Sequence, residues 1–279
     1  MTINKALKHA FDLLVGNVNT PSLDASLLLC ELLKMDKTTL IINGNDELPK
    51  KKYDKYKRLI KRRLNGECIA YITGHKEFYG LDFMVNKKVL VPRPETEILV
   101  EKSIDLLKTK NQNTNKSILD LCTGSGAIAI AIKHTMPELE VWASDISKKA
   151  LAIARKNGVR LKLEIKFIKS DLFSNIKGCF DIIITNPPYI CSKKISSLAL
   201  EVQREPRIAL DGGLDGLDLI HRIIKDSVRH LNPGGYILME ADSGQIPVIE
   251  KILLNAGFRD CVSYKDLGNQ LRVIAASYG

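Results

Sequence analysis

Apolar side chains in the first part of the chain recur at helical spacing. Leu7, Phe11 and Leu14 stand four and three residues apart, and a second series of similar spacing runs from Leu23 to Leu32. Side chains three and four positions apart lie on the same face of a helix. The pattern therefore predicts a small helical domain at the N-terminus.

The pattern changes between Ile69 and Val91 to shorter runs that are rich in β-forming residues. Gly74 and Gly80 stand at positions where such runs can turn. We expect a β-hairpin linker in this segment.

Beyond Pro94, apolar strand-like runs alternate with helical patterns. A helix is predicted over residues 95–108, followed by a polar stretch over residues 110–116. The predicted strands are residues 117–122, 140–144, 164–169, 181–185, 235–240, 259–264 and 270–277. Strands that alternate with helices form a parallel sheet covered on both faces.

The last two predicted strands are joined by only a few residues, between Tyr264 and Gln270. This connection is too short for a crossover helix, so the two strands should pair antiparallel. A mostly parallel sheet that ends in such a pair is typical of Rossmann-like methyltransferases rather than of dehydrogenases. The predicted class is α/β, a seven-stranded sheet with a small helical domain and a hairpin linker. The predicted domains are residues 1–67, 68–94 and 95–279.

Composition places the chain among ordinary globular proteins. Its 279 residues are 45% hydrophobic, which is enough to bury a full core. No run approaches the roughly 18 apolar residues of a membrane span, and the first residues do not build a signal sequence. Six scattered cysteines without a C-x-x-C pair predict reduced thiols and no metal site. We expect a cytoplasmic location.

The basic excess is concentrated in one predicted helix. The formal net charge is +10, and residues 50–63 include nine lysines and arginines. This cluster is either a solvated helix face or a patch that meets ribosomal RNA or an acidic protein. Both interpretations stay open, and nucleic-acid contact is expected only as a secondary feature.

A glycine-rich turn joins the first strand of the sheet to an apolar helix. Gly124 and Gly126 let the backbone approach a ligand, and the helix that follows offers unpaired N–H groups. The spacing also fits the dinucleotide fingerprint, with Ala129 as its third small residue. Ligand binding, a nicotinamide enzyme and a structural turn are the alternatives.

Two acidic residues follow the next two strands. Asp145 stands about twenty residues beyond the glycine turn, a distance at which a carboxylate can hold both hydroxyls of an adenosine ribose. Its alternative role is to cap the next helix, which Ser147 could also do. Asp171 could reach the adenine amino group or could be a simple cap.

The sequence Asn186-Pro187-Pro188-Tyr189 directly follows an apolar strand. A strand terminator would not need Asn186 or Tyr189. In open α/β sheets, ligands bind at the carboxyl ends of the strands. These four residues are therefore the strongest candidates for chemistry in the chain.

This motif suits a planar nitrogen acceptor. The lone pair of an amide or aryl amine is delocalised, so the nitrogen must be oriented before it can attack. The side-chain carbonyl of Asn186 and the backbone carbonyl of Pro187 can accept both N–H bonds of a target NH₂. Tyr189 supplies a flat face. A sulfonium methyl donor needs no metal and no covalent intermediate, since positioning carries most of the work.

With these motifs, the chain resembles the release factor glutamine methyltransferase family along essentially its whole length. The resemblance rests on "YITGHKEFYGLDFMV", "VPRPETEILVE", the glycine turn, "TNPPYI", "EVQREPRIALDGGLDGLDLIHRII" and "LNPGGYILME". It implies S-adenosylmethionine as methyl donor and, as acceptor, the glutamine amide in the Gly-Gly-Gln tripeptide of peptide-chain release factors.

The resemblance also implies which residues bind each substrate. The donor would meet Cys122, Thr123, Gly124, Ser125, Gly126, Asp145, Leu172 and Asn186, with Asp171 nearby. The substrate glutamine would meet Asn186, Pro187, Pro188 and Tyr189, with Asn186, Pro187 and Tyr189 in the catalytic role.

Three positions depart from the family pattern. Cys122 replaces the first glycine of the turn, so we expect that this position does not require a positive φ. Leu172 replaces an aromatic residue and would flank adenine with an aliphatic side chain. The wording of residues 239–245 is also unusual, and no role for it follows from the sequence.

Two other acceptors remain as alternatives. Exocyclic amino groups of nucleic-acid bases pose the same electronic problem, and the basic helix favours them. Against this, the chain shows no additional target-recognition domain. A ribosomal-protein glutamine is the second alternative, although "RPETE" from Arg93 to Glu97 is the release-factor wording. A nonenzymatic binding module would not explain the intact transfer motif.

Overall fold

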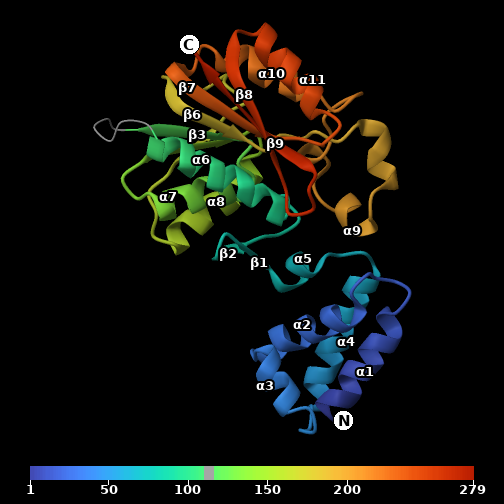
Figure 1. The fold of residues 1–279 in the computed structure, drawn as a ribbon. Coiled ribbons are helices and arrows are strands. Elements are labelled where there is room, and N and C mark those ends of the chain that lie inside the picture. Colours follow the sequence, from blue (N-terminus) through green and yellow to red (C-terminus); the bar gives the residue numbers. More distant parts are fainter. Residues whose placement is uncertain (110–115) are drawn as a thin grey trace. The chain divides into compact units, whose positions relative to one another are not determined.

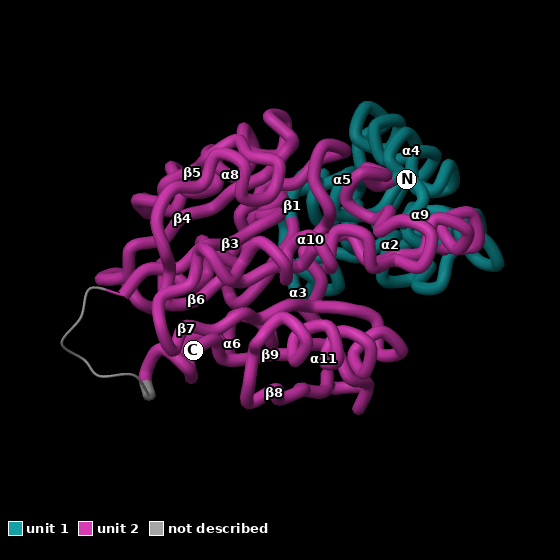
Figure 2. The backbone as a smooth tube through the Cα atoms, turned by 90° about the horizontal axis from the view of Figure 1, so that it is seen from above, with its two compact units in different colours: residues 1–75, 199–204 teal, residues 76–198, 205–279 magenta. Residues whose placement is uncertain are grey.

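The computed structural model describes residues 1–109 and 116–279 and divides the chain into two compact units (Figures 1 and 2). Unit 1 contains Met1–His75 and Ala199–Arg204, and unit 2 contains Lys76–Leu198 and Glu205–Gly279. The polar stretch predicted over residues 110–116 lies outside the described residues except for Lys116. The predicted domain bounds near residues 67 and 94 remain predictions.

Unit 1 is helical, as the spacing of its apolar residues predicts. Its helices are α1 (Ile3–Leu14), α2 (Pro21–Leu33), α3 (Lys37–Ile42), α4 (Lys50–Leu64), α5 (Ile69–Thr73) and α9 (Leu200–Gln203). Leu14, Leu28 and Tyr56 belong to its buried core. The hydroxyl of Tyr56 donates a hydrogen bond to the carbonyl of Ala25 at 2.8 Å, which satisfies the one polar atom of this buried ring.

The hairpin linker is present but shorter than expected. β1 (His75–Phe78) pairs with β2 (Leu81–Met84) in a two-stranded sheet. The prediction of β structure from Ile69 was wrong, because Ile69–Thr73 forms α5. Two of its residues, Tyr71 and Ile72, are buried, and Gly74 ends the helix at a φ of 84°. Tertiary burial thus outweighs the β preference of this short apolar run.

Unit 2 is built on a seven-stranded sheet, which confirms the predicted fold class. Its strands are β3 (Ser117–Leu121), β4 (Glu140–Asp145), β5 (Lys166–Lys169), β6 (Phe180–Thr185), β7 (Leu231–Glu240), β8 (Phe258–Lys265) and β9 (Leu271–Tyr278). Their order is β5-β4-β3-β6-β7-β9-β8. The strands from β5 to β7 are parallel, and β8 and β9 form the predicted antiparallel pair. β9 also pairs antiparallel with β7.

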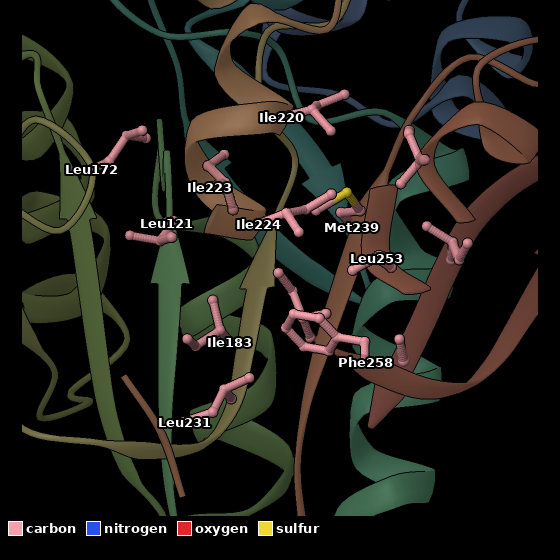
Figure 3. Close-up of a cluster of buried hydrophobic side chains, with 14 of the residues drawn as sticks. Leu121, Leu172, Ile183, Ile220, Ile223, Ile224, Leu231, Met239, Leu253 and Phe258 are labelled. Atoms are coloured by element: carbon pink, nitrogen blue, oxygen red, sulfur yellow. The ribbon is translucent and has the colours of Figure 1, made fainter. Parts of the chain in front are cut away.

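The helices of unit 2 cover both faces of the sheet. They are η1 (Pro94–Thr96), α6 (Glu97–Thr109), α7 (Ala127–Thr135), α8 (Lys148–Arg160), η2 (Ser192–Ser197), η3 (Arg207–Ala209), α10 (Asp218–Ser227) and α11 (Ile246–Asn255). In Figure 1, α6, α7 and α8 lie on one face, and α10 and α11 lie on the other. Figure 3 shows the core on the second face, where Leu121, Ile183 and Met239 of the sheet pack with Ile224 of α10 and Leu253 of α11.

The register of the sheet brings several strand ends to one edge. Leu121 of β3 pairs with Ser144 of β4 on one side and with Thr185 of β6 on the other. Thr185 in turn pairs with Met239 of β7. The strand order reverses between β3 and β6, and a crevice for ligands forms at such a switch point. Residues just beyond these four strand ends are therefore neighbours.

Candidate active site

A pocket of about 260 Å³ opens at this edge of the sheet. Seven residues predicted for donor or acceptor binding line it: Cys122, Gly124, Asp145, Asp171, Leu172, Asn186 and Pro188. The other predicted residues, Thr123, Ser125, Gly126, Pro187 and Tyr189, lie outside the lining. Lining residues that the sequence did not reveal include Lys88, Leu90, Ile146, Ile208, Leu219 and Arg222. Most of these are apolar or lie on loops, where sequence spacing carries little information.

The glycine turn leaves β3 through a left-handed backbone. Cys122, Gly124 and Gly126 have φ angles of 61°, 56° and 84°. The expectation that Cys122 would not need a positive φ was wrong. A left-handed residue other than glycine costs roughly 1–2 kcal/mol, so the turn imposes this conformation on the cysteine.

The two glycines serve different purposes. A Cβ atom on Gly124 would come no closer than 4.0 Å to the carbonyl oxygen of Cys122, so this part of the turn is open to a ligand. A Cβ atom on Gly126 would lie 3.1 Å from the Cβ of Ala154. Gly126 therefore allows α7 and α8 to pack closely and does not line the pocket.

Asp120, which was not among the predicted site residues, holds the turn from the protein interior. Its side chain is fully buried, and one carboxylate oxygen accepts hydrogen bonds from the Thr123 hydroxyl at 2.6 Å and the Ala129 amide at 3.2 Å. Thr123 therefore faces the protein interior. The available signal was an acidic residue inside an otherwise apolar strand, since a buried carboxylate requires partners.

Burial raises the pKa of Asp120 to about 7. The pKa in the unfolded chain is near 3.8, so the folded state binds this proton more tightly. This group's contribution to the free energy of unfolding is full below that lower pKa and is lost as the pH rises through about 7. We expect the stability of the wild type relative to Asp120→Asn to fall by about 2–4 kcal/mol between pH 4 and pH 8. Urea unfolding of both proteins measures this, and a constant difference would contradict it.

Asp145 lies at the end of β4 and holds the turn in place. Its two carboxylate oxygens accept hydrogen bonds from the amides of Gly124 at 2.9 Å and Ser147 at 2.7 Å. The cap of α8 is Ser147, whose hydroxyl accepts from the Ala150 amide at 3.2 Å. Asp145 lines the pocket, and each of its carboxylate oxygens has a further lone pair that can accept a hydrogen bond. Burial raises its pKa above the usual value.

Asp171 and Leu172 form the wall beyond β5. The carboxylate of Asp171 pairs with the guanidinium of Arg222, with distances of 3.0 and 3.1 Å to its two oxygens. This pair is about half exposed at the rim of the pocket. Leu172 is buried with a φ of 46° and presents an aliphatic surface. The Asp171 side chain thus pairs across the pocket rim with a residue of α10.

The side chains of the Asn-Pro-Pro-Tyr motif are held by two residues distant in sequence. The Nδ2 of Asn186 donates a hydrogen bond to the Thr96 hydroxyl oxygen at 3.1 Å. The Thr96 and Tyr189 hydroxyls both donate to Glu240, at 2.6 and 3.1 Å. Thr96 belongs to the "RPETE" segment, and Glu240 belongs to the segment whose wording is unusual.

The backbone of the motif is held by a glycine-rich loop. The amide of Gly212 donates to the carbonyl of Ile190 at 2.9 Å. Gly216 has a φ of 83°, and a Cβ atom there would lie 2.2 Å from the carbonyl oxygen of Tyr189. The same carbonyl accepts from the Nε2 of Gln245 at 2.9 Å. Only glycine allows the loop to approach the motif this closely.

The basic residues of helix α4 do not all face solvent. Arg63 is buried and forms ion pairs with Asp24 at 2.6 Å and Glu201 at 2.7 Å. Arg62 pairs with Glu67 at 2.6 Å. These two arginines stabilise unit 1. The exposed part of the cluster consists of Lys50, Lys51, Lys52, Lys55, Lys57, Arg58 and Lys61.

Comparisons with known proteins identify relatives that match nearly the whole chain. Residues 5–74 match the family described as PrmC N-terminal domain, and residues 100–211 match the family described as Methyltransferase small domain. The chain is 40% identical over 274 residues to a release factor glutamine methyltransferase of Buchnera aphidicola, and this alignment covers 98% of each protein. A protein of the same description from Clostridium botulinum is 39% identical over 267 residues, with 94% of this chain and 93% of that protein covered.

Among solved structures, the fold is similar to that of a methyltransferase from Pyrococcus furiosus. The TM-score is 0.54 at 20% identity, and 78% of this chain and 97% of the other are covered. At this identity the likeness shows the fold alone. None of the described helices is both long enough and apolar enough to cross a membrane.

Proposed function

The chain belongs to the release factor glutamine methyltransferase family, and we propose that it transfers a methyl group from S-adenosylmethionine to a release-factor glutamine. The acceptor we propose is the side-chain amide in the Gly-Gly-Gln tripeptide. The observation that carries this proposal is the anchored Asn186 beside the pocket at the switch point of the sheet. Its neighbours fix its amide in one position, as a reaction governed by orientation requires.

The pocket residues fit an adenosine-containing donor. Gly124 leaves the turn open, and the carboxylate of Asp145 offers lone pairs to the two ribose hydroxyls. Leu172, Ile146 and Leu219 supply apolar surface for the base. S-adenosylmethionine, when bound, supplies an electrophilic methyl group on a good leaving group.

The chain's own contribution is to align the acceptor. Asn186 directs its NH₂ group toward Thr96, so its carbonyl oxygen is available to accept an N–H bond of the substrate amide. The Pro187 carbonyl is suited to accept the second N–H bond, and Tyr189 supplies the flat face. Together they would aim the nitrogen lone pair at the methyl carbon. The surplus proton leaves after the new C–N bond has formed.

We expect Asp145→Ala to weaken donor binding by about 10- to 100-fold, because a charge-assisted hydrogen bond is worth roughly 1.5–3 kcal/mol at most and water in the space left by the side chain replaces part of the loss. Titration calorimetry with S-adenosylmethionine measures this change. Asp171→Ala is the matched control, since that carboxylate is half exposed and already paired with Arg222, and it should have a smaller effect. Unchanged affinity in a folded Asp145→Ala protein would remove Asp145 from the site.

The acceptor class is tested by offering several substrates to one enzyme. Purified release factors, ribosomal proteins, tRNA, rRNA and DNA are incubated separately with the labelled methyl donor. We expect label only on release factors. Label on a nucleic acid or on a ribosomal protein, with none on release factors, would replace the proposed acceptor by one of the two alternatives.

A further inference from the structure

A buried chain of hydrogen bonds runs from the end of β7 to the candidate active site. Glu240 is 1% exposed and Thr96 is 5% exposed, so neither has ready access to water. The Thr96 hydroxyl donates to Oε2 of Glu240 at 2.6 Å and accepts from Nδ2 of Asn186 at 3.1 Å. The Tyr189 hydroxyl donates to Oε1 of the same carboxylate at 3.1 Å. One buried acid therefore contacts both ends of the Asn-Pro-Pro-Tyr motif, at one end through Thr96.

We propose that Glu240 is a positioning residue which, through the Thr96 hydroxyl, determines which end of the Asn186 amide faces the methyl acceptor. This inference rests on the proposed function, because it assigns the roles of Glu240 and Thr96 in the same reaction.

The direction of these hydrogen bonds follows from the donor and acceptor capacity of each group. Both carboxylate oxygens of Glu240 accept from hydroxyl groups, so the single proton of the Thr96 hydroxyl is committed to Glu240. The Thr96 oxygen can then only accept from Asn186. The Asn186 amide must therefore turn its NH₂ group to Thr96 and its carbonyl oxygen away from it.

This direction matters because the two ends of an asparagine amide have nearly the same shape. Sterics alone would permit Asn186 to rotate by half a turn about its last side-chain bond. The rotated amide would present N–H donors to the N–H donors of the substrate, and alignment would be lost. The hydrogen bonds from Asn186 through Thr96 to Glu240 exclude this second orientation, although neither Thr96 nor Glu240 contacts the substrate.

The surroundings of Glu240 include groups that favour and oppose its charge. The pKa of Glu240 lies above its usual value, because burial outweighs the hydrogen bonds from Thr96 and Tyr189 that lower it. Arg272 on β9 also favours the charged form, and Glu95 opposes it. Two hydroxyl donors together with a nearby guanidinium are the arrangement expected around a buried carboxylate that accepts hydrogen bonds.

The test compares two conservative substitutions at Thr96, the middle of the hydrogen-bond chain. Thr96→Ser keeps the hydroxyl, whereas Thr96→Val keeps the shape and removes it. We expect single-turnover methylation of a release factor at saturating donor to slow by about 10- to 100-fold in Thr96→Val. Thr96→Ser should stay within about 3-fold of the wild type. The KM for release factor and the Kd for donor should change much less than the rate, which a general structural defect would not produce.

Glu240→Gln provides a second route if Thr96→Val folds poorly. A glutamine has one donor and one acceptor end, so it no longer commits the Thr96 proton, and we expect about a 10-fold slower rate. Equal rates for Thr96→Ser and Thr96→Val, or a wild-type rate for Glu240→Gln, would overturn the inference while leaving the proposed function intact. Failure of the wild-type enzyme to methylate the release factor would instead overturn the proposed function and this inference with it.

Discussion

Asn186→Ala is expected to slow methyl transfer by about 100-fold or more while leaving donor affinity only modestly changed. The alanine removes both the carbonyl that accepts from the substrate and the NH₂ group that anchors it to Thr96. The acceptor nitrogen then samples many orientations, of which few allow in-line attack. Single-turnover rates at saturating donor separate this loss from any loss of binding.

Three further variants refine the role of the motif. Asn186→Asp should be similarly damaging, because an ionised aspartate lacks the N–H donor and adds charge to a closing pocket. Tyr189→Phe should be milder than Tyr189→Ala, since phenylalanine keeps the flat face and loses only the hydrogen bond to Glu240. Near-wild-type transfer by Asn186→Ala would remove the main reason for an amide or amino acceptor.

Asp24→Ala is expected to lower the free energy of unfolding by about 3–5 kcal/mol, because it leaves the charge of Arg63 buried without its closest partner. Both side chains are less than 9% exposed and their atoms lie 2.6 Å apart. The second partner, Glu201, is 36% exposed and compensates only in part. Urea unfolding followed by the circular dichroism of the helices measures the loss.

Asp24→Asn is the matched control, since its single amide oxygen can still accept from Arg63, whereas its NH₂ group takes the place of the oxygen that accepts from the Thr20 hydroxyl. We expect it to cost clearly less than the alanine substitution. A loss below about 1 kcal/mol in Asp24→Ala would mean that the pair contributes no more than an exposed ion pair.

Patterns local in sequence predicted the fold well. The alternation of strands and helices and the short final connection led to the seven-stranded sheet with its antiparallel end. Local information failed at Ile69–Thr73, where burial of Tyr71 and Ile72 favours a helix. It failed again at Cys122, because the course of the turn, rather than the residue, sets the positive φ.

The candidate site was predictable only where its residues form one continuous motif. Asn186 and Tyr189 were identified because four unusual residues follow a strand. Their anchors Thr96 and Glu240 were not, since these are 144 residues apart and meet only after β7 and η1 have packed. Buried polar groups need partners, but the identity of each partner is decided by tertiary structure.

The basic helix illustrates the same limit for charge. Its sequence suggested a single cluster, yet Arg63 is directed into unit 1 by two acids from distant segments. Counting charges along the chain therefore overstates the surface that is free to meet a partner. For the exposed lysines of α4, both interpretations stay open: a solvated helix face or a contact with an acidic partner.

The most direct test of the central proposal is to locate the transferred methyl group by peptide mass mapping of a release factor incubated with enzyme and donor. The account predicts one added methyl group on the glutamine of the Gly-Gly-Gln tripeptide. It also predicts no transfer when that glutamine is replaced by alanine, and almost none with Asn186→Ala enzyme. A methyl group on another residue, or undiminished labelling of the release factor that lacks this glutamine, would contradict it.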